Sequence, residues 1–302
     1  MKIILGGKMK DYLVKSLAYE GQLRVYAIDA TRTVQQAQKI HNTWSAGTMA
    51  LGRTLAATAM LSAASLKGKE KMTVKIMGDG PAGAIVVDGN AEGKVKGYLQ
   101  NPHVHFPLND KNKVSVKDAV GSKGFLSVTK DLGLKMPFTG QVPLVSGELG
   151  EDFTYYLAKS EQIPSAVGLA TVLNEDNSVK LAGGFMIQVL PQTSKKIITK
   201  LEKKLALLPA LSELMIHNNS PEEIIFELCG KNNVKILEKI PVSYSCDCSK
   251  DRFAKSLSSI AAKDLETMIK EDHGAEAICH FCGKKYYFSE DELKKLYSKS
   301  FS

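Results

Sequence analysis

Four of the five cysteines in this 302-residue chain form two close pairs near its end. Cys246 and Cys248 make a C-x-C pair, and Cys279 and Cys282 make a C-x-x-C pair after a longer insert. Two thiolate pairs can complete the tetrahedral coordination of one metal ion, and zinc is the metal that such a site prefers. Gly283 follows the second pair directly, where a tight turn around the sulfur atoms favours a residue without a Cβ atom. The spacing therefore predicts one zinc ion held by these four cysteines.

A zinc site of this kind is compatible with a purely structural role or with redox regulation. Structural sites are the commoner class. Here, however, the cysteines belong to a tail of about sixty residues, which is too small to hold a large apolar core. Zinc binding contributes on the order of 10 kcal/mol of folding free energy to such segments. Because oxidants attack thiolates, oxidation would remove the ligands and that support, so a redox switch is chemically reasonable.

Other residues of ligand-binding type fit simpler interpretations. Gly78, Gly80 and Gly83 match a dinucleotide-binding pattern. The stretch after them is predicted to be a strand, whereas phosphate binding requires a helix N-terminus there. His103 and His105 lie in a predicted loop without acidic or cysteine partners nearby in the sequence, so we interpret them as surface or satisfied histidines.

Three isolated residues are also assigned no ligand role. His280 lies between two ligand cysteines, but four sulfur atoms already fill a tetrahedron, so it is predicted to be a bystander. Cys229 ends an apolar helix and is expected to be a small buried residue, and Trp44 is expected to lie in the core. The chain contains no nucleophile elbow, P-loop or H-E-x-x-H motif. We therefore predict no catalytic residues and no enzyme activity.

Composition and cysteine usage indicate the compartment. Five cysteines in a long chain without a secretory signal argue against a disulfide scaffold, and residues 1–7 lack the apolar core of a signal peptide. The best candidate for a membrane span, residues 46–66, contains Arg53 and many small residues, which favours a buried helix instead. We expect a cytoplasmic protein with no membrane partner.

The order of apolar periods and turn residues predicts an α+β fold. Helices are expected at 34–41 and 45–66, and an antiparallel sheet is expected from strands at 23–29, 71–77, 83–88, 94–100, 125–130, 154–158, 167–173 and 182–190. From Thr193 the chain becomes helical and rich in lysine, with helices at 195–208, 210–217 and 221–229 and a strand at 234–243. Ser220 with Glu223, and Ser289 with Glu292, are capping signals for the helix after Ser220 and for a final helix through Leu296.

Longer motifs along nearly the whole chain resemble the redox-regulated 33 kDa heat-shock chaperonin family, bacterial holdases that work without ATP. The matching segments are Gly78-Asp79-Gly80-Pro81, Gly97-Tyr98, Asn101-Pro102, Thr129-Lys130-Asp131-Leu132-Gly133, Thr139-Gly140-Gln141-Val142-Pro143, Ser146-Gly147-Glu148, Tyr155-Tyr156, Ser160-Glu161-Gln162-Ile163-Pro164-Ser165 and Ala182-Gly183-Gly184. The chain departs from the family at Phe138, where relatives often carry tyrosine, and near Ile260-Ala261, where a glycine is expected. The second departure concerns a local turn and not the cysteines.

The resemblance implies a mixed α/β core domain over residues 1–188, a helical linker over 189–240 and a small zinc-binding redox-switch domain over 241–302. It implies a reduced form that holds zinc and an oxidised form with disulfides Cys246–Cys248 and Cys279–Cys282. Oxidation would release zinc, unfold the C-terminal domain and expose a surface that binds unfolding client proteins, with the oxidised form a homodimer. Protection against oxidative and heat stress would follow.

Two other functional classes remain as alternatives. A net charge of +8, a pI near 9.0 and the basic aromatic run at 284–288 are compatible with a nucleic-acid-binding zinc protein. The lysines are spread along the chain, however, and the run also has the alternation of a strand, so no specific nucleic acid is expected. A thiol-disulfide oxidoreductase is less well supported, because this C-x-x-C pair does not follow a strand and open a helix.

Overall fold

The structure, a computed structural model, describes residues 11–107, 114–217 and 220–301. The prediction that residues 1–7 are not a signal peptide concerns residues outside that part. Contacts divide the chain into two compact units, Met1–Ser245 and Cys246–Ser302. The fold is mixed, with helices and mainly antiparallel sheets, as the sequence predicted. The functional division into core, linker and switch domains stays a prediction.

The first unit contains two sheets. The five-stranded sheet has the order β10-β1-β2-β9-β8, and the six-stranded sheet has the order β11-β5-β4-β3-β6-β7. Neighbouring strands are antiparallel except for the short parallel pair of β11 with β5. The strands of the first sheet are β1 Tyr12–Ala18, β2 Leu23–Asp29, β8 Ser165–Leu173, β9 Val179–Val189 and β10 Val234–Pro241. Those of the second are β3 Lys71–Gly78, β4 Ala84–Asn90, β5 Lys94–Leu99, β6 Gly124–Asp131, β7 Phe138–Pro143 and β11 Ser243–Tyr244.

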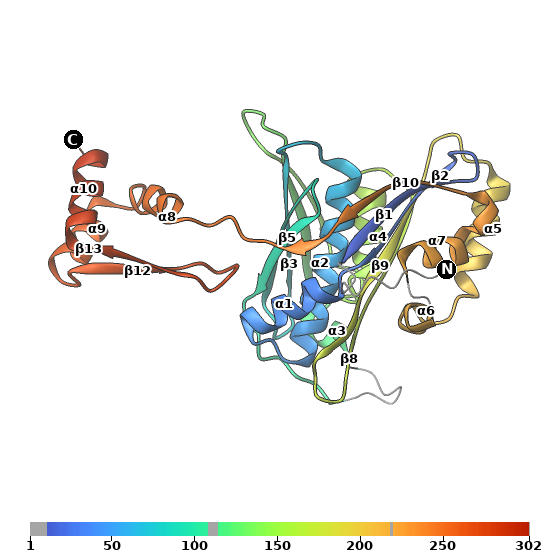
Figure 1. The fold of residues 1–302 in the computed structure, drawn as a ribbon, viewed down its shortest axis with the longest axis horizontal. Helices are drawn as coiled ribbons and strands as arrows, with labels where there is room; N and C mark the ends of the chain where they lie inside the picture. Colours follow the sequence, from blue (N-terminus) through green and yellow to red (C-terminus); the bar gives the residue numbers. More distant parts are fainter. Residues whose placement is uncertain (1–10, 108–113, 218–219, 302) are drawn as a thin grey trace, which may run out of the picture. The chain divides into compact units, whose positions relative to one another are not determined.

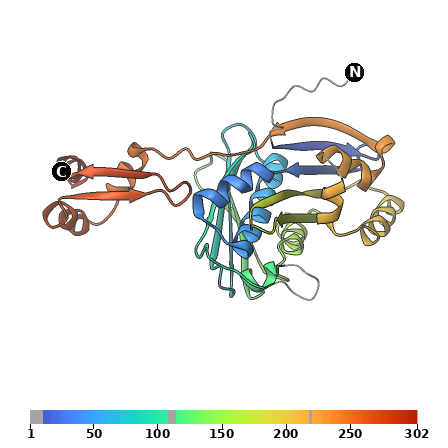
Figure 2. The ribbon, with the colours of Figure 1, turned by 60° about the horizontal axis from the view of Figure 1, so that its bottom comes forward.

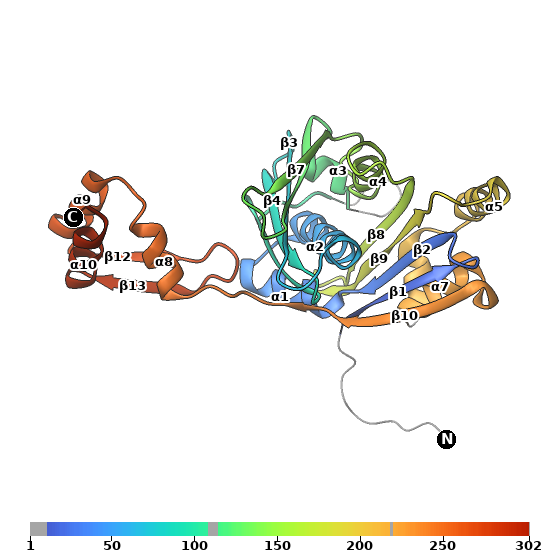
Figure 3. The ribbon, with the colours of Figure 1, turned by 90° about the horizontal axis from the view of Figure 1, so that it is seen from above.

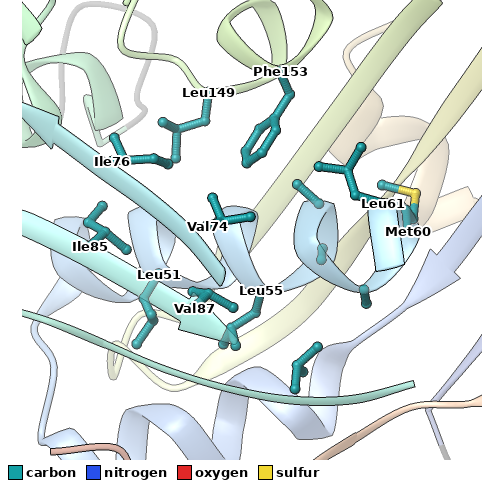
Figure 4. Close-up of a cluster of buried hydrophobic side chains, with 14 of the residues drawn as sticks. Leu51, Leu55, Met60, Leu61, Val74, Ile76, Ile85, Val87, Leu149 and Phe153 are labelled. Carbon is teal, nitrogen blue, oxygen red and sulfur yellow. The ribbon is translucent and has the colours of Figure 1, made fainter. Parts of the chain in front are cut away.

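A long apolar helix, α2 (Ser45–Ser65), runs between the two sheets and contacts strands of both (Figure 3). Its small residues let the strands approach it closely, and nearly all of its side chains are buried. Figure 4 shows Leu51 and Leu55 beside Val74 and Val87 of the six-stranded sheet, in the main apolar core. The helix α1 (Thr31–His41) precedes it. No helix among the described residues is both long and apolar enough to cross a membrane.

The predicted strand at 154–158 is wrong, because this segment lies in helix α4 (Gly150–Lys159). Its aromatic and β-branched residues favour a strand locally, but Phe153, Tyr156 and Leu157 are spaced to bury one helical face. Asp152 also accepts hydrogen bonds from the backbone N–H groups of four residues between 145 and 149, which fixes the turn that starts the helix. The predictions also missed β1, β7 and the short helix α3 (Val116–Val120).

The three helices after residue 193 form as predicted and pack beside the five-stranded sheet. They are α5 (Lys195–Ala206), α6 (Leu211–His217) and α7 (Pro221–Cys229), and all three contact β-strands or each other in this unit (Figure 1). The predicted cap of α7 is present, since Ser220 Oγ accepts a hydrogen bond from the Glu223 N–H at 3.3 Å. A short 3₁₀ turn at Lys231–Asn233 then leads into β10, which pairs with β1.

The C-terminal unit is small. It contains α8 (Lys250–Leu257), α9 (Ala262–Lys270), β12 (Gly274–Ile278), β13 (Lys285–Ser289) and α10 (Glu290–Phe301). Figure 2 shows the antiparallel pair formed by β12 and β13. The predicted capping box of α10 is confirmed, because Ser289 and Glu292 exchange hydrogen bonds at 2.9 and 3.3 Å. The buried side chains of its core are Leu265, Ile269, Tyr286, Phe288 and Leu293.

Candidate metal centre

The C-terminal unit brings the four paired cysteines together. Cys246 and Cys248 lie in the segment before α8, and Cys279 and Cys282 lie in the turn between β12 and β13. Their four Sγ atoms all lie within 4.8 Å of one another, with Cys246 3.7 Å from Cys279 and Cys248 3.4 Å from Cys282. Around a zinc ion with Zn–S bonds of about 2.3 Å, tetrahedral sulfur atoms are about 3.8 Å apart. The cluster therefore has the dimensions of a four-sulfur metal site, and its donor set suits zinc.

The turn that carries Cys279 and Cys282 has the geometry expected of a tight knuckle. The Cys279 N–H donates to the Lys284 carbonyl at 3.0 Å, and the Gly283 N–H donates to the Cys279 carbonyl at 2.8 Å. Gly283 has φ +69°, a left-handed conformation that glycine adopts without strain. The prediction for Gly283 is confirmed.

The segment that carries Cys246 and Cys248 is held by the start of α8 and by Tyr286 of β13. Ser249 caps α8 by accepting a hydrogen bond from the Arg252 N–H at 3.3 Å, and Arg252 forms an ion pair with Asp247 at 2.8 Å. The hydroxyl of Tyr286 on β13 reaches Cys248, lying 3.2 Å from its Sγ atom and 3.0 Å from its carbonyl oxygen. The start of the unit and its β12–β13 hairpin thus meet at one sulfur cluster.

The thiols of the cluster differ in their readiness to lose a proton. Burial raises the pKa of Cys246 and of Cys282, although backbone N–H groups of Cys248 and Lys284 offset part of the effect. Burial also raises the pKa of Cys248, but hydrogen bonds with Tyr286 and the other cysteines outweigh it and lower that pKa to about 7. Metal binding requires thiolates, and the hydrogen bonds that Cys248 receives favour that form.

The remaining cysteine lies outside the cluster. Cys229 is buried at the end of α7, as predicted, and burial raises its pKa to about 12. His280 is exposed and is not among the clustered ligands. All five cysteines are free thiols in this structure. The sulfur separations of 3.7 and 3.4 Å each join one cysteine from each sequence pair, so the disulfide pairing stays a prediction.

The other singled-out residues have partners in the first unit. Both histidines are exposed, as predicted for surface residues. His105 lies 2.8 Å from Ser45 Oγ, and the His103 ring lies against Trp44 with centroids 5.1 Å apart. The expectation that Trp44 lies in the core is wrong, since 51% of its surface is exposed. It occupies the N-cap position of α2, where the side chain lies over the loop and not between the sheets. The segment after Gly83 is the strand β4, so the predicted strand is confirmed and no helix N-terminus follows these glycines.

A family model described as "Hsp33 protein" matches residues 11–289 of the chain. The chain belongs to the Hsp33 family. The 33 kDa chaperonin of Latilactobacillus sakei is 62% identical over 288 residues, which cover 95% of this chain and 99% of the relative. That of Listeria monocytogenes serotype 4a is 52% identical over 294 residues, covering 97% and 100%. A crystal structure of the 33 kDa chaperonin from Thermotoga maritima superposes with a TM-score of 0.88 at 36% identity, covering 96% of this chain and 99% of that one.

Membership of the Hsp33 family establishes the general kind of function. Its curated relatives are named chaperonins, so this chain is a chaperone, a class of protein that binds other proteins as clients and is generally not enzymatic. In the basic aromatic run, Tyr286 and Phe288 are buried and alternate with exposed residues on β13, as predicted for a strand. The C-x-x-C pair lies in a hairpin turn and not at a helix N-terminus. These positions support neither of the alternative functions, nucleic-acid binding and thiol-disulfide exchange.

Proposed function

We propose that this Hsp33-family protein is a redox-regulated, ATP-independent holdase that protects against oxidative and heat stress. Oxidation of Cys246, Cys248, Cys279 and Cys282 removes the ligands of one zinc ion, the C-terminal unit unfolds, and a surface for unfolding client proteins is uncovered. The observation that carries the proposal is the sulfur cluster that joins the start of the C-terminal unit to its β12–β13 turn, in a unit with a very small core.

The C-terminal unit depends on a cross-link because its apolar core is too small to stabilise it alone. Among the described residues of this unit, five buried apolar side chains form that core. Below about 70 residues a core of this type rarely supplies more than about 3–5 kcal/mol, and structural zinc adds on the order of 10 kcal/mol. A bound zinc ion would keep the four sulfurs as thiolates and tie the segment before α8 to the β12–β13 turn. Without it, little would oppose unfolding.

The cysteines themselves supply the redox chemistry. With hydrogen peroxide as the oxidant, a thiolate sulfur attacks one peroxide oxygen, the O–O bond breaks, and the leaving hydroxide takes a proton to become water. The resulting sulfenic acid condenses with a second thiol, so an S–S bond forms, another water leaves, and the two sulfurs have given two electrons to the peroxide. We assign the disulfides to Cys246–Cys248 and Cys279–Cys282. Sulfurs joined in this way no longer act as thiolate ligands.

The surface that would be uncovered is the face of the five-stranded sheet beneath α5, α6 and α7, which we call the linker helices. Val14, Val25 and Ile187 of the sheet are fully buried there against apolar side chains of the helices, which are Leu201, Leu214, Ile224, Ile225 and Leu228. Each buried aliphatic side chain contributes about 1.5–3 kcal/mol to the docking of these helices. Their release would expose a continuous apolar patch, the type of surface that binds unfolded segments.

The linker helices cover the sheet incompletely. A groove of about 310 Å³ remains at the α5–α6 turn, lined by Phe185 of β9 together with Leu205, Leu208 and Leu211. Beside it, Leu207 is 83% exposed. Farther along, polar contacts fasten α7, since Glu222 accepts a hydrogen bond from Tyr12 of β1 at 2.8 Å and pairs with Lys239 of β10. We therefore infer that the linker helices loosen first at the α5–α6 turn.

The remaining parts of the proposal follow the family resemblance. The boundaries 1–188, 189–240 and 241–302 mark the core, linker and switch domains. The partners are unfolding proteins in the cytoplasm, the oxidised form is a homodimer, and no membrane or specific nucleic acid takes part.

The test compares suppression of aggregation of a heat-denatured client by zinc-loaded reduced protein and by peroxide-treated protein. Zinc release and free thiols are counted in the same samples. We expect activity to rise as about four thiols and one zinc ion per chain are lost, a stoichiometry set by the cluster. Cys229 in the same chain is the internal control, since that thiol lies outside the cluster and should stay reduced while the other four are lost. Equal suppression by the reduced and oxidised forms would refute the switch.

A further inference from the structure

Tyr286 lies outside the ligand set and touches the sulfur cluster directly. The Tyr286 hydroxyl lies 3.2 Å from the Sγ atom of Cys248 and 3.0 Å from the carbonyl oxygen of the same residue. Its ring belongs to the small core of the unit, is 8% exposed and stacks against Phe253 with centroids 5.1 Å apart. Core packing thus holds the hydroxyl against Cys248.

The direction of this hydrogen bond follows from the chemistry of a ligand sulfur. A thiol can donate or accept, but a thiolate has no proton, so beside a thiolate only the tyrosine can donate. The hydroxyl has one proton and two acceptors within reach, and the charged sulfur is the stronger acceptor. Cys246 and Cys282 receive backbone N–H groups instead, which no substitution removes cleanly.

We propose that Tyr286 is a positioning residue of the sulfur cluster, whose hydroxyl donates to the Cys248 thiolate and slows the attack of that sulfur on peroxide. A hydrogen bond draws electron density from the sulfur, so the lone pair that would attack the O–O bond becomes less available. The residue thereby sets how much oxidant is needed before the first S–O bond forms. This inference rests on the metal site of the proposed function.

The test uses the full-length chain with a Tyr286→Phe substitution, which removes one oxygen atom and keeps the buried ring. Tyr287→Phe is the matched control, because Tyr287 lies on the same strand, is 63% exposed and bonds to Glu276 instead of a cysteine. Zinc release under hydrogen peroxide is followed with a chromogenic chelator. Removing a partner of a metal ligand typically changes affinity by about 10–100-fold, so we expect Tyr286→Phe to release zinc roughly tenfold faster than the wild type. The control should match the wild type.

Two further readouts separate tuning of the sulfur from simple loosening of the fold. Replacing zinc with Co²⁺ gives sulfur-to-metal charge-transfer bands, which should move to lower energy in Tyr286→Phe because the sulfur lone pairs rise in energy. Trapping of sulfenic acid with a dimedone probe should increase at Cys248 relative to Cys282. Faster release with unshifted bands, or unchanged release in Tyr286→Phe, would overturn the inference while leaving the switch intact. A wild-type chain that binds no metal would overturn both.

Discussion

Shortening Ile225 tests whether the linker helices cover the client surface. Ile225 lies in α7, is 0% exposed, and packs in the apolar layer between that helix and the five-stranded sheet. Replacing a buried isoleucine with alanine costs about 2–5 kcal/mol, because apolar contacts are lost and a cavity remains. These contacts exist only while α7 is docked. A loss of about 3 kcal/mol would therefore multiply the undocked population roughly 150-fold.

The expected result of Ile225→Ala is a reduced, zinc-loaded protein that already suppresses aggregation of a heat-denatured client. Backbone amides of α7 should exchange with deuterium faster by a comparable factor, because local opening governs their protection. Ile85→Ala is the matched control. Ile85 is also 0% exposed, but it lies on β4 in the other apolar cluster, beneath the six-stranded sheet. That variant should lose a similar free energy of unfolding and stay inactive while reduced.

The comparison has a clear negative outcome. If Ile225→Ala frees α7 in hydrogen exchange yet leaves the reduced protein as inactive as Ile85→Ala, the sheet face beneath the linker helices is not the surface that binds clients.

Three further predictions concern the metal site and the docking of α7. Cys279→Ser, at a ligand position that is 4% exposed, should abolish zinc binding by elemental analysis and make the C-terminal unit sensitive to protease, and retention of one zinc per chain would contradict the four-sulfur site. Burial raises the pKa of Cys229 from 9.0 to about 12, so the stabilisation that the neutral thiol gives to docking of α7 is complete below pH 9 and is lost as pH rises toward 12. Alkylation of Cys229 should accelerate over that pH range. Hydrogen exchange of α7 should accelerate over the same range in the wild type but not in Cys229→Ala. Glu222→Gln weakens the contacts with Tyr12 and Lys239 by about 1–2 kcal/mol and should lower the temperature at which the oxidised protein becomes active. An unchanged activation temperature would show that Glu222 does not hold α7 on the sheet.

The candidate site was partly visible in the sequence because cysteine pairs have a narrow set of uses. The ligand candidates, the knuckle glycine and the capping box of α10 all depend on residues close in the sequence. Tyr286 was not recognised as a contact of Cys248, since its alternation with exposed neighbours indicated only a strand. A clue was available, because a tyrosine four residues after a ligand cysteine lies on the strand that leaves the turn. Only the pairing of β12 with β13, and the packing of the segment before α8, decide which sulfur it reaches.

Local pattern by itself determined the α+β class, the long apolar helix, most strands and the two cysteine pairs, because each is set by a short period or by residues a few positions apart. The tertiary structure decided what depends on contacts between distant segments. Residues 154–158 have strand-like composition, yet they form α4 because burial of Phe153, Tyr156 and Leu157 on one face outweighs local preference. The strand β10 joins β1 across more than two hundred residues, and Trp44 stays exposed because the loop of His103, not a sheet, faces it. Such pairings follow from which apolar surfaces meet, and no single segment contains that information.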